Sequence, residues 1–427
     1  MKQGLVRLLQ APQLLRVISS QSASTYANQV IAFVIPWLVL TRTGSAVHAG
    51  AVAFAIGVSS VAGILLGGLI TDRIGGRKVS IIADALSLMT ALALAITLFF
   101  DFFALWLVIV SQVIGVFFDG PGSIAKNTMV PAAAKQDDVP VVRAMGLQHT
   151  LQNMAMFLGP VSAGILIAVL TESLTLMIAS VLFLVCVFLV ANLPRQIIEK
   201  EQPITVRQAF ADLREAVRFL VKEPFLGPMQ VFGPLYAFIL LPVSAIVFPA
   251  WFVFAGQAPT SLGIFLGAQA LGGMLGGFAF AALAPKVSQH KWLIGASAAY
   301  SLALFSLYFL QPGSALAIAV GFLAGLAITG IMAIPYTAFY TRTPQKLLGR
   351  VNSLGAAAGY LVSALAALFF GWLVNAASAG TGIMVCAVGM GLLAVGTLFL
   401  PFMRLLDDTK ESVKAQDRPK NQAGQAA

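Results

Sequence analysis

Charged residues are scarce in this chain of 427 residues, and acidic ones are scarcer than basic ones. Only 10% of the residues are charged and 59% are hydrophobic, whereas a soluble protein carries roughly 25% charged residues. Because so few polar side chains cannot cover the surface of a water-soluble fold, we expect the protein to be embedded in lipid. Strict alternation of polar and apolar residues is also missing, which disfavours a transmembrane β-barrel.

Signatures of metal, nucleotide and enzyme sites are missing as well. The two cysteines, Cys186 and Cys386, lie in apolar runs, which predicts neither a disulfide nor a metal site. The patterns G-x-x-x-x-G-K-[ST] and H-E-x-x-H do not occur, so neither ATP binding nor zinc-dependent proteolysis is indicated. We expect no cofactor, no metal and no enzymatic activity, and we expect an ion gradient to supply any energy.

Long apolar runs occupy most of the chain. A helix that crosses a bilayer needs about 20 apolar residues. Twelve such runs lie at 16–41, 48–71, 79–100, 103–126, 143–170, 173–193, 226–254, 260–284, 291–311, 314–340, 351–376 and 379–403. The predicted fold class is therefore an all-α membrane protein with twelve transmembrane helices.

The basic residues fall on one side of the predicted membrane. If the N-terminus is cytoplasmic and the twelve spans alternate, Arg42 is the only one of 26 Lys and Arg residues that lies outside. Short cytoplasmic loops are enriched in Lys and Arg. The distribution therefore predicts cytoplasmic N- and C-termini in a bacterial inner membrane, and it explains the net charge of +10 without nucleic acid.

The longest polar interruption divides the runs six and six. The predicted units are an N-terminal six-helix bundle (1–193), a cytoplasmic linker (194–225), a C-terminal six-helix bundle (226–404) and a disordered cytoplasmic tail (405–427). Apolar residues at three- and four-residue steps from Val206 to Leu220 predict an amphipathic helix in the linker. We expect this helix to lie along the cytoplasmic face, with a regulatory docking site as the alternative.

The two halves resemble each other. The stretch from Arg143, "RAMGLQHTLQNMAMFLGPVSAGIL", matches the stretch from Arg350, "RVNSLGAAAGYLVSALAALFFGWL", at an arginine, two leucines and a glycine, with a constant separation of 207 residues. A parallel repeat predicts two bundles related by a pseudo-twofold axis along the membrane normal. A binding site is then expected near the midplane, where the halves meet.

The stretch "GGLITDRIGGRK", residues 67–78, lies between the second and third predicted spans. It resembles the G-x-L-a-D-R-x-G-R-[RK] loop of the major facilitator superfamily, apart from Ile70, Thr71 and Gly76. The matching positions include Gly68, Asp72, Arg73, Gly75, Arg77 and Lys78. The resemblance implies a charge network that holds the cytoplasmic side shut, and we add Asp84 and Arg143 as partners. Charges that only set the topology are the alternative.

A second pattern lies in the fifth predicted span. Drug exporters of this superfamily carry G-(x)8-G-(x)3-G-P-x-x-G-G there, and this chain keeps Gly146, Gly159, Pro160 and Gly164 but has Ala155 and Ala163. Small residues let membrane helices approach closely. We expect the fifth and eighth helices to touch, and the pattern favours an exporter over an importer.

Asp84 and Asp119 are the only carboxylates well inside apolar runs. An ionised carboxylate at the bilayer centre costs about 2.5–3.5 kcal/mol on insertion scales, so such residues usually have a function. Asp119 lies in "FFDGPGS" of the fourth span, and we predict that it is the proton-coupling residue. The alternative is a salt bridge from Asp119 to Lys126 or Arg143.

His149 is a second proton candidate, because histidine titrates near pH 6.5. A hydrogen-bonded residue between helices is the alternative. The predicted substrate cavity is apolar with a few amide and tyrosine groups, from Tyr26, Asn28, Gln29, Gln152, Tyr236, Gln269, Tyr336 and Tyr340.

The resemblance is closest to the drug:proton antiporter branch that includes macrolide-efflux-like and siderophore-exporter-like proteins. It implies a monomeric, proton-coupled exporter of hydrophobic or amphipathic small molecules that works by alternating access. The alternatives are a dedicated exporter of one siderophore or lysolipid, an importer or uniporter, and a membrane enzyme or receptor without transport.

Overall fold

The computed structural model describes residues 11–194, 206–283 and 286–406, apart from the side chains at positions 68, 69, 72, 206–213 and 404. Within these residues the first half consists of α2 (Pro12–Thr43), α3 (Ala46–Ile74), α4 (Gly76–Phe99), α5 (Leu105–Gln136), α6 (Val141–Val169) and α7 (Glu172–Ala191). The second half consists of α9 (Leu226–Pro242), the π-helix η2 (Val243–Val247), α10 (Phe248–Phe254), α11 (Pro259–Leu283), α12 (Gln289–Tyr308), α13 (Ala315–Arg342), α14 (Leu348–Ala376) and α15 (Ala379–Phe399).

The predicted linker and tail are described in part. The linker contains α8 (Val206–Lys222), while its residues 195–205 lie outside the described part. In the tail, residues 407–427 also lie outside it. After α15 the chain forms a 3₁₀ helix, η3 (Pro401–Arg404), and Leu406 is fully buried.

The prediction of twelve membrane helices is confirmed. Eleven helical segments of the described chain are long and apolar enough to cross a bilayer, and α9, η2 and α10 together count as one of them. The remaining predicted span is α12, which has 20 residues and packs against α13 and α15. Its hydropathy is lowered by polar residues such as Ser297 and Tyr300, which are fully buried against protein.

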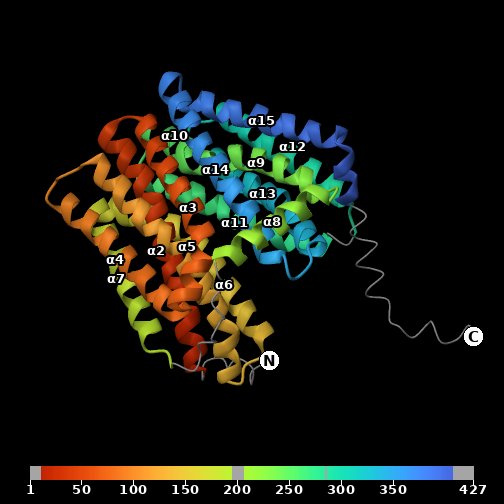
Figure 1. The fold of residues 1–427 in the computed structure, drawn as a ribbon. Helices are drawn as coiled ribbons and strands as arrows, with labels where there is room; N and C mark the ends of the chain where they lie inside the picture. The colour runs from red at the N-terminus through yellow and green to blue at the C-terminus, as the bar shows by residue number, and fades with distance from the viewer. Residues whose placement is uncertain (1–10, 195–205, 284–285, 407–427) are drawn as a thin grey trace, which may run out of the picture.

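The two halves form separate bundles, which Figure 1 shows in red to yellow and in green to blue. They touch mainly where α3 meets α14 and where α6 meets α11. In the sequence repeat, α3 corresponds to α11 and α6 corresponds to α14. A twofold rotation therefore exchanges the two contacts, which confirms the predicted pseudo-twofold arrangement.

Two equivalent glycines of the repeat, Gly164 and Gly371, form matching contacts between the halves. A Cβ atom on Gly371 would lie 2.7 Å from the carbonyl oxygen of Ala46, and one on Gly164 would lie 2.6 Å from that of Pro259. Because backbone atoms occupy this space, a larger residue would push the helices apart. These glycines set how closely the halves approach.

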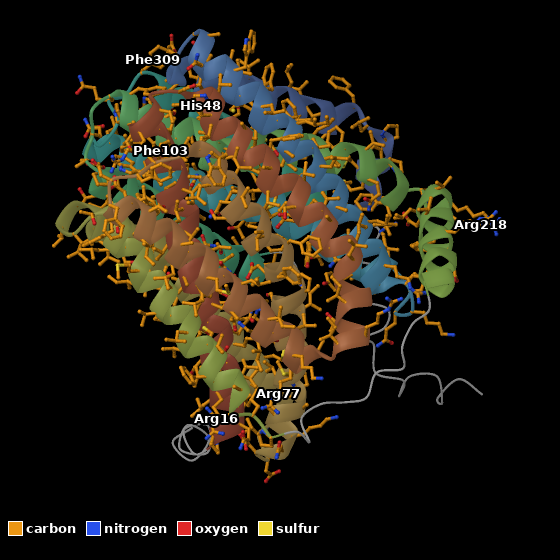
Figure 2. All side chains as sticks on the ribbon, turned by 60° about the vertical axis from the view of Figure 1, so that its left-hand side comes forward. Arg16, His48, Arg77, Phe103, Arg218 and Phe309 are labelled. Atoms are coloured by element: carbon orange, nitrogen blue, oxygen red, sulfur yellow. The ribbon has the colours of Figure 1, made fainter. Side chains whose placement is uncertain are left out.

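Within the described residues, the close contacts between the halves run from one end of the molecule to about the middle of the helices, where Gly57 meets Tyr360 and Ala364. We call the end where α2 begins and α15 ends the terminal face, and the other end the opposite face. In Figure 2, Arg16 and Arg77 lie at the terminal face, and His48 lies at the opposite face. The glycine contacts join the ends of α6 and α14 at the opposite face, whereas Leu66 and Met154, nearer the terminal face, are exposed. The structure is therefore closed at the opposite face and open at the terminal face.

Close packing inside the second half leads to a stability prediction. A Cβ atom on Gly272 of α11 would overlap the carbonyl oxygen of Phe322 on α13, whereas one on Gly295 of α12 would have no neighbour within 4 Å. We expect Gly272→Ala to destabilise the protein by about 1–3 kcal/mol through overpacking. Thermal unfolding in detergent measures this effect, with Gly295→Ala as the matched control. Equal melting temperatures for the two variants would contradict the packing described here.

Candidate functional site

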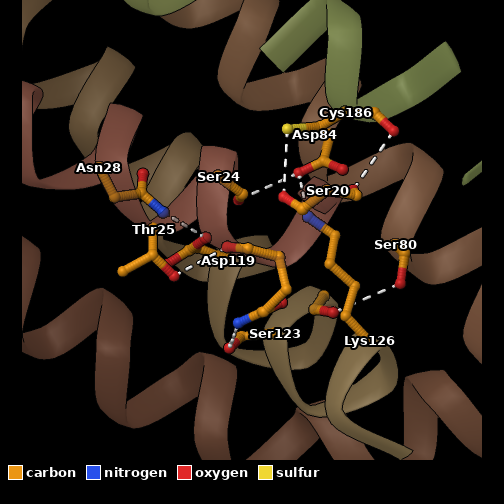
Figure 3. Close-up of polar contacts among 12 residues, drawn as sticks. Ser20, Ser24, Thr25, Asn28, Ser80, Asp84, Asp119, Ser123, Lys126 and Cys186 are labelled. Atoms are coloured by element: carbon orange, nitrogen blue, oxygen red, sulfur yellow. Dashed lines mark hydrogen bonds and ion pairs between the residues drawn. The ribbon is translucent and has the colours of Figure 1, made fainter. Parts of the chain in front are cut away.

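A polar seam runs through the first half, between α2, α4 and α5. Residues three or four apart lie on one face of a helix, and each of these helices turns three such polar residues toward the other two. They are Gln21, Ser24 and Asn28 on α2, Ser80, Asp84 and Ser87 on α4, and Asp119, Ser123 and Lys126 on α5. Figure 3 shows most of these side chains converging between the helices.

The centre of the seam is an ion pair between Asp84 and Lys126. The Lys126 Nζ atom lies 2.7 Å from Asp84 Oδ1, and the two side chains are 2% and 3% exposed. Ser24 Oγ donates a second hydrogen bond to the same oxygen, at 3.3 Å. Asp84 Oδ2 is buried without a hydrogen-bond partner among the described residues. Removing one member of a buried pair typically costs about 3–5 kcal/mol, because the other charge is left uncompensated.

Asp119 has an amide partner instead of a cation. Asn28 Nδ2 donates a hydrogen bond to Asp119 Oδ1 at 2.7 Å. No Lys or Arg of the described chain lies within salt-bridge distance of Asp119, and Lys126 is engaged by Asp84. The alternative expectation, a salt bridge from Asp119 to Lys126 or Arg143, is therefore not what the structure contains.

A small cavity lies beside Asp119. It has a volume of about 30 Å³ and is lined by Asn28, Ser87, Thr90 and Gln112, among others. That volume has room for one or two water molecules. Gln112 also lines a second cavity, of about 240 Å³, between the halves, where Tyr360 of α14 contributes. Gln112 therefore lies between the cavity beside Asp119 and the interface between the halves.

The second half contributes an uncharged cavity of about 280 Å³ between α9, α13 and α14. Of the predicted cavity residues, Tyr236 and Tyr336 line it, and the Tyr336 hydroxyl lies 3.2 Å from that of Tyr340. No charged side chain is found among the described residues around it. Asn352 also lines it, together with Met229, Gln230, Met332 and Phe339, which sequence analysis left out.

Three of the remaining predicted cavity residues, Tyr26, Gln29 and Gln269, lie against protein neighbours. Tyr26 donates to Ser162 Oγ at 2.6 Å, and Gln29 lies where α2 meets Gly159 of α6. Gln269 is buried where α11 meets α13, with its amide nitrogen unpaired among the described residues. Gln152 is half-buried on α6.

The predicted loop network is only partly described. Gly75 separates α3 from α4 with a φ of +89°, which favours glycine, so the tight turn needs this residue. Arg77 donates to the carbonyl oxygen of Ala191 at the end of α7. Position 68 and the Asp72 side chain lie outside the described residues. Arg73, Lys78 and Arg143 are exposed, and Asp84 pairs with Lys126 rather than with these bases.

The fifth span places its motif residues in two environments. Gly164 and the carbonyl oxygen of Pro160 contact α11, as expected for close approach of the two helices. A Cβ on Gly146 would meet no atom within 4 Å. His149 is exposed on α6, whereas its neighbour Gln148 is buried and donates to Asn127 Oδ1.

Comparisons with known proteins agree with this geometry. The sequence profile described as Major Facilitator Superfamily matches residues 17–367. The chain is 27% identical to the multidrug efflux pump Tap of Mycolicibacterium fortuitum, over 93% of this chain and 97% of that protein. It is 22% identical to the enterobactin exporter EntS of Salmonella typhi, over 91% of this chain and 92% of that protein. The solved structure of the nucleoside transporter NupG matches with a TM-score of 0.74 at 14% identity, over 91% of this chain and 98% of that one.

The open terminal face predicts which cysteines react with a water-soluble maleimide. The native Cys186 and Cys386 are fully buried and should stay unlabelled in the folded protein. Met332 is 49% exposed and lines the uncharged cavity, whereas Val52 is 2% exposed and lies between the halves. We expect Met332→Cys to be labelled and Val52→Cys to stay unlabelled over the same time, measured by mass spectrometry. The reverse order of labelling would mean that the opposite face is the open one.

Proposed function

Because this chain belongs to the major facilitator superfamily, we propose that it is a proton-coupled exporter of hydrophobic or amphipathic small molecules, working by alternating access. The observation that carries the proposal is Asp119, a carboxyl group held by Asn28 beside a water-sized cavity, with no cationic partner within the described chain. Such a group in a membrane helix is stable when a proton or a cationic ligand neutralises it. The names of Tap and EntS, an efflux pump and an exporter, support transport out of the cell rather than into it.

The proposed orientation places the terminal face in the cytoplasm of a bacterium, as the distribution of Lys and Arg favours. The conformation described here is then the inward-open state, in which substrate enters from the cytoplasm. Protonated Asp119 loses its proton to cytoplasmic water as substrate binds. The halves then rock about the glycine contacts, substrate leaves on the other side, and Asp119 takes up a proton there.

The loop after α3 is proposed to hold the terminal face shut in the outward-open state. Asp72, Arg73, Arg77, Lys78 and Arg143 supply the charges of this network. Gly75 gives the turn its tight course, and Gly68 is the motif glycine within α3. Arg77, in the first turn of α4, already contacts the end of α7 in the inward-open state. In this movement residues 1–193 and 226–404 are proposed to be two rigid units, joined by the linker 194–225. The proposed working unit is a monomer.

Substrate is proposed to bind between Asp119 and the uncharged cavity of the second half. Tyr236, Tyr336 and Tyr340 give that wall aromatic surface, and Gln230 and Asn352 give it hydrogen-bonding groups. A surface of this kind accepts apolar molecules of varied shape. His149 is exposed on α6 and is kept as a second proton candidate.

A dedicated exporter of one siderophore is the second candidate, because the similarity to EntS covers nearly the whole chain. The two functions differ in their substrates. A multidrug exporter should protect cells against several unrelated compounds. A dedicated exporter should protect against none, and its deletion should leave one metabolite trapped in the cell.

The proposal is tested with purified protein in liposomes, under an imposed pH gradient, with a panel that includes ethidium, doxorubicin and enterobactin. We expect Asp119→Asn to lower pH-driven movement to the level of protein-free liposomes, because the amide cannot exchange a proton. His48→Gln, at an exposed position on the opposite face, is the control for a general effect of losing a titratable side chain, and we expect it to retain most of the activity. Undiminished movement in Asp119→Asn would assign proton coupling to another residue, and no movement by wild-type protein would sink the transporter proposal.

A further inference from the structure

The seam in the first half contains two carboxyl groups and one ammonium group. Asp84 and Lys126 form the ion pair, and Asp119 lies on the same face of α5 as Lys126, two turns before it. Cys186 of α7 is hydrogen-bonded to Ser20 beside the seam, and Tyr360 of α14 lines the neighbouring cavity with Gln112. Thiols and phenols are ordinarily uncharged at neutral pH. The Asp84–Lys126 pair sums to zero, so ionised Asp119 leaves the seam with a net charge of −1.

The hydrogen bonds of the seam keep Lys126 at Asp84. Asp84 Oδ1 accepts from both Lys126 and Ser24. On α5, Ser123 lies between Asp119 and Lys126, and it accepts a hydrogen bond from Gln21 Nε2 at 3.0 Å. Asp119 is held by Asn28, one turn further along α2 than Ser24. The ammonium group is therefore bound on one side of the seam, and Asp119 is held separately on the other.

We propose that Asp84 is a positioning residue for proton coupling, because it holds the positive charge of Lys126 away from Asp119. This inference rests on the proposed function. Burying an unpaired charge in lipid is costly, so each half-cycle must cross the membrane with Asp119 neutralised. Since Lys126 is engaged, either one proton or one cationic substrate does this, and the two compete for the same carboxylate.

This charge count fixes the stoichiometry for a permanent monovalent cation such as ethidium. One proton bound at Asp119 is released to water when ethidium takes its place, and one proton returns when ethidium leaves. The exchange moves no net charge. It should therefore respond to a pH gradient and ignore a membrane potential.

Neutralising Asp84 alone should abolish the exchange. In Asp84→Asn, Lys126 loses its partner, and Asp119 is the remaining carboxylate for it to neutralise. The empty carrier is then neutral without a proton, and a bound ethidium would bring the seam to +1, an unpaired charge that is costly to carry through lipid. We expect this variant to move ethidium neither under a pH gradient nor under a membrane potential.

Neutralising Lys126 alone should leave the coupling in place. In Lys126→Met, Asp84 is buried without a cation and is expected to hold a proton permanently. Asp119 still needs one exchangeable proton. In the double variant Asp84→Asn/Lys126→Met, the two lost charges cancel and Asp119 is again the only charge. Both variants should behave like wild type.

The experiment measures steady-state ethidium gradients in proteoliposomes, with a pH gradient or with a potassium–valinomycin potential. For wild type, Lys126→Met and the double variant, we expect about a tenfold gradient per pH unit and no response to potential. For Asp84→Asn, we expect only the passive background under either gradient, and the return of pH coupling in the double variant distinguishes this result from a folding defect. Asp119→Asn and protein-free liposomes give the passive background.

A purely structural ion pair predicts a different pattern, because Asp84→Asn and Lys126→Met would each leave one buried charge and be impaired alike. Retained pH coupling in Asp84→Asn would overturn the inference. Loss of pH coupling in folded Lys126→Met would also overturn it. The Lys126→Met result therefore tests the inference even if Asp84→Asn does not fold. Failure of wild-type protein to move ethidium under a pH gradient would overturn the proposed function, and this inference with it. If wild-type protein couples ethidium movement to the pH gradient but a variant departs from its expected result, only this inference is overturned.

Discussion

The cost of an unneutralised charge in lipid is the constraint on which the rest of this structure depends. Among the described residues it keeps nearly all Lys and Arg near the terminal face, and it leaves two carboxylates deep in the apolar runs. One of them, Asp84, is paired with Lys126 at 2.7 Å, so its charge is cancelled within the protein. The other, Asp119, has only an amide partner. The same constraint that makes the fold stable thus singles out one group whose neutralisation must come from outside.

Close approach between the halves is the second requirement, and here small residues replace charges. Gly164 and Gly371 contact the backbone of the other half at equivalent places in the repeat. Lipid gives little hydrophobic drive for helices to associate, so packing of small residues provides the contact. Among the described residues the glycine contacts lie between the opposite face and the middle of the helices, so they can serve as a pivot while the terminal face opens and closes in the proposed cycle.

Hydropathy predicted the helices well because bilayer thickness sets a minimum apolar length, but it placed their ends poorly. Helix α5 continues to Gln136, ten residues beyond the predicted run, because a helix that leaves the hydrocarbon no longer needs apolar residues. The pairing of Lys126 with Asp84 depends on how α4 and α5 are rotated, which spacing along one chain does not determine. For the same reason Tyr26 and Gln269 were predicted to line the cavity, although their side chains meet protein. The signal for Lys126 was present, since a lysine inside an apolar run seldom lacks a partner.

The two halves share a fold but divide the chemistry. The sequence has no Asp or Glu between Glu223 and Asp407, so the membrane helices of the second half contribute no carboxylate to the charge count. Their cavity is apolar, with tyrosine and amide groups. An uncharged wall can accept many shapes at little cost, whereas a single carboxylate in the other half can be neutralised by only one proton or cation at a time. In the proposed cycle, breadth of substrate recognition and strictness of proton coupling can coexist because they reside in different halves of one repeat.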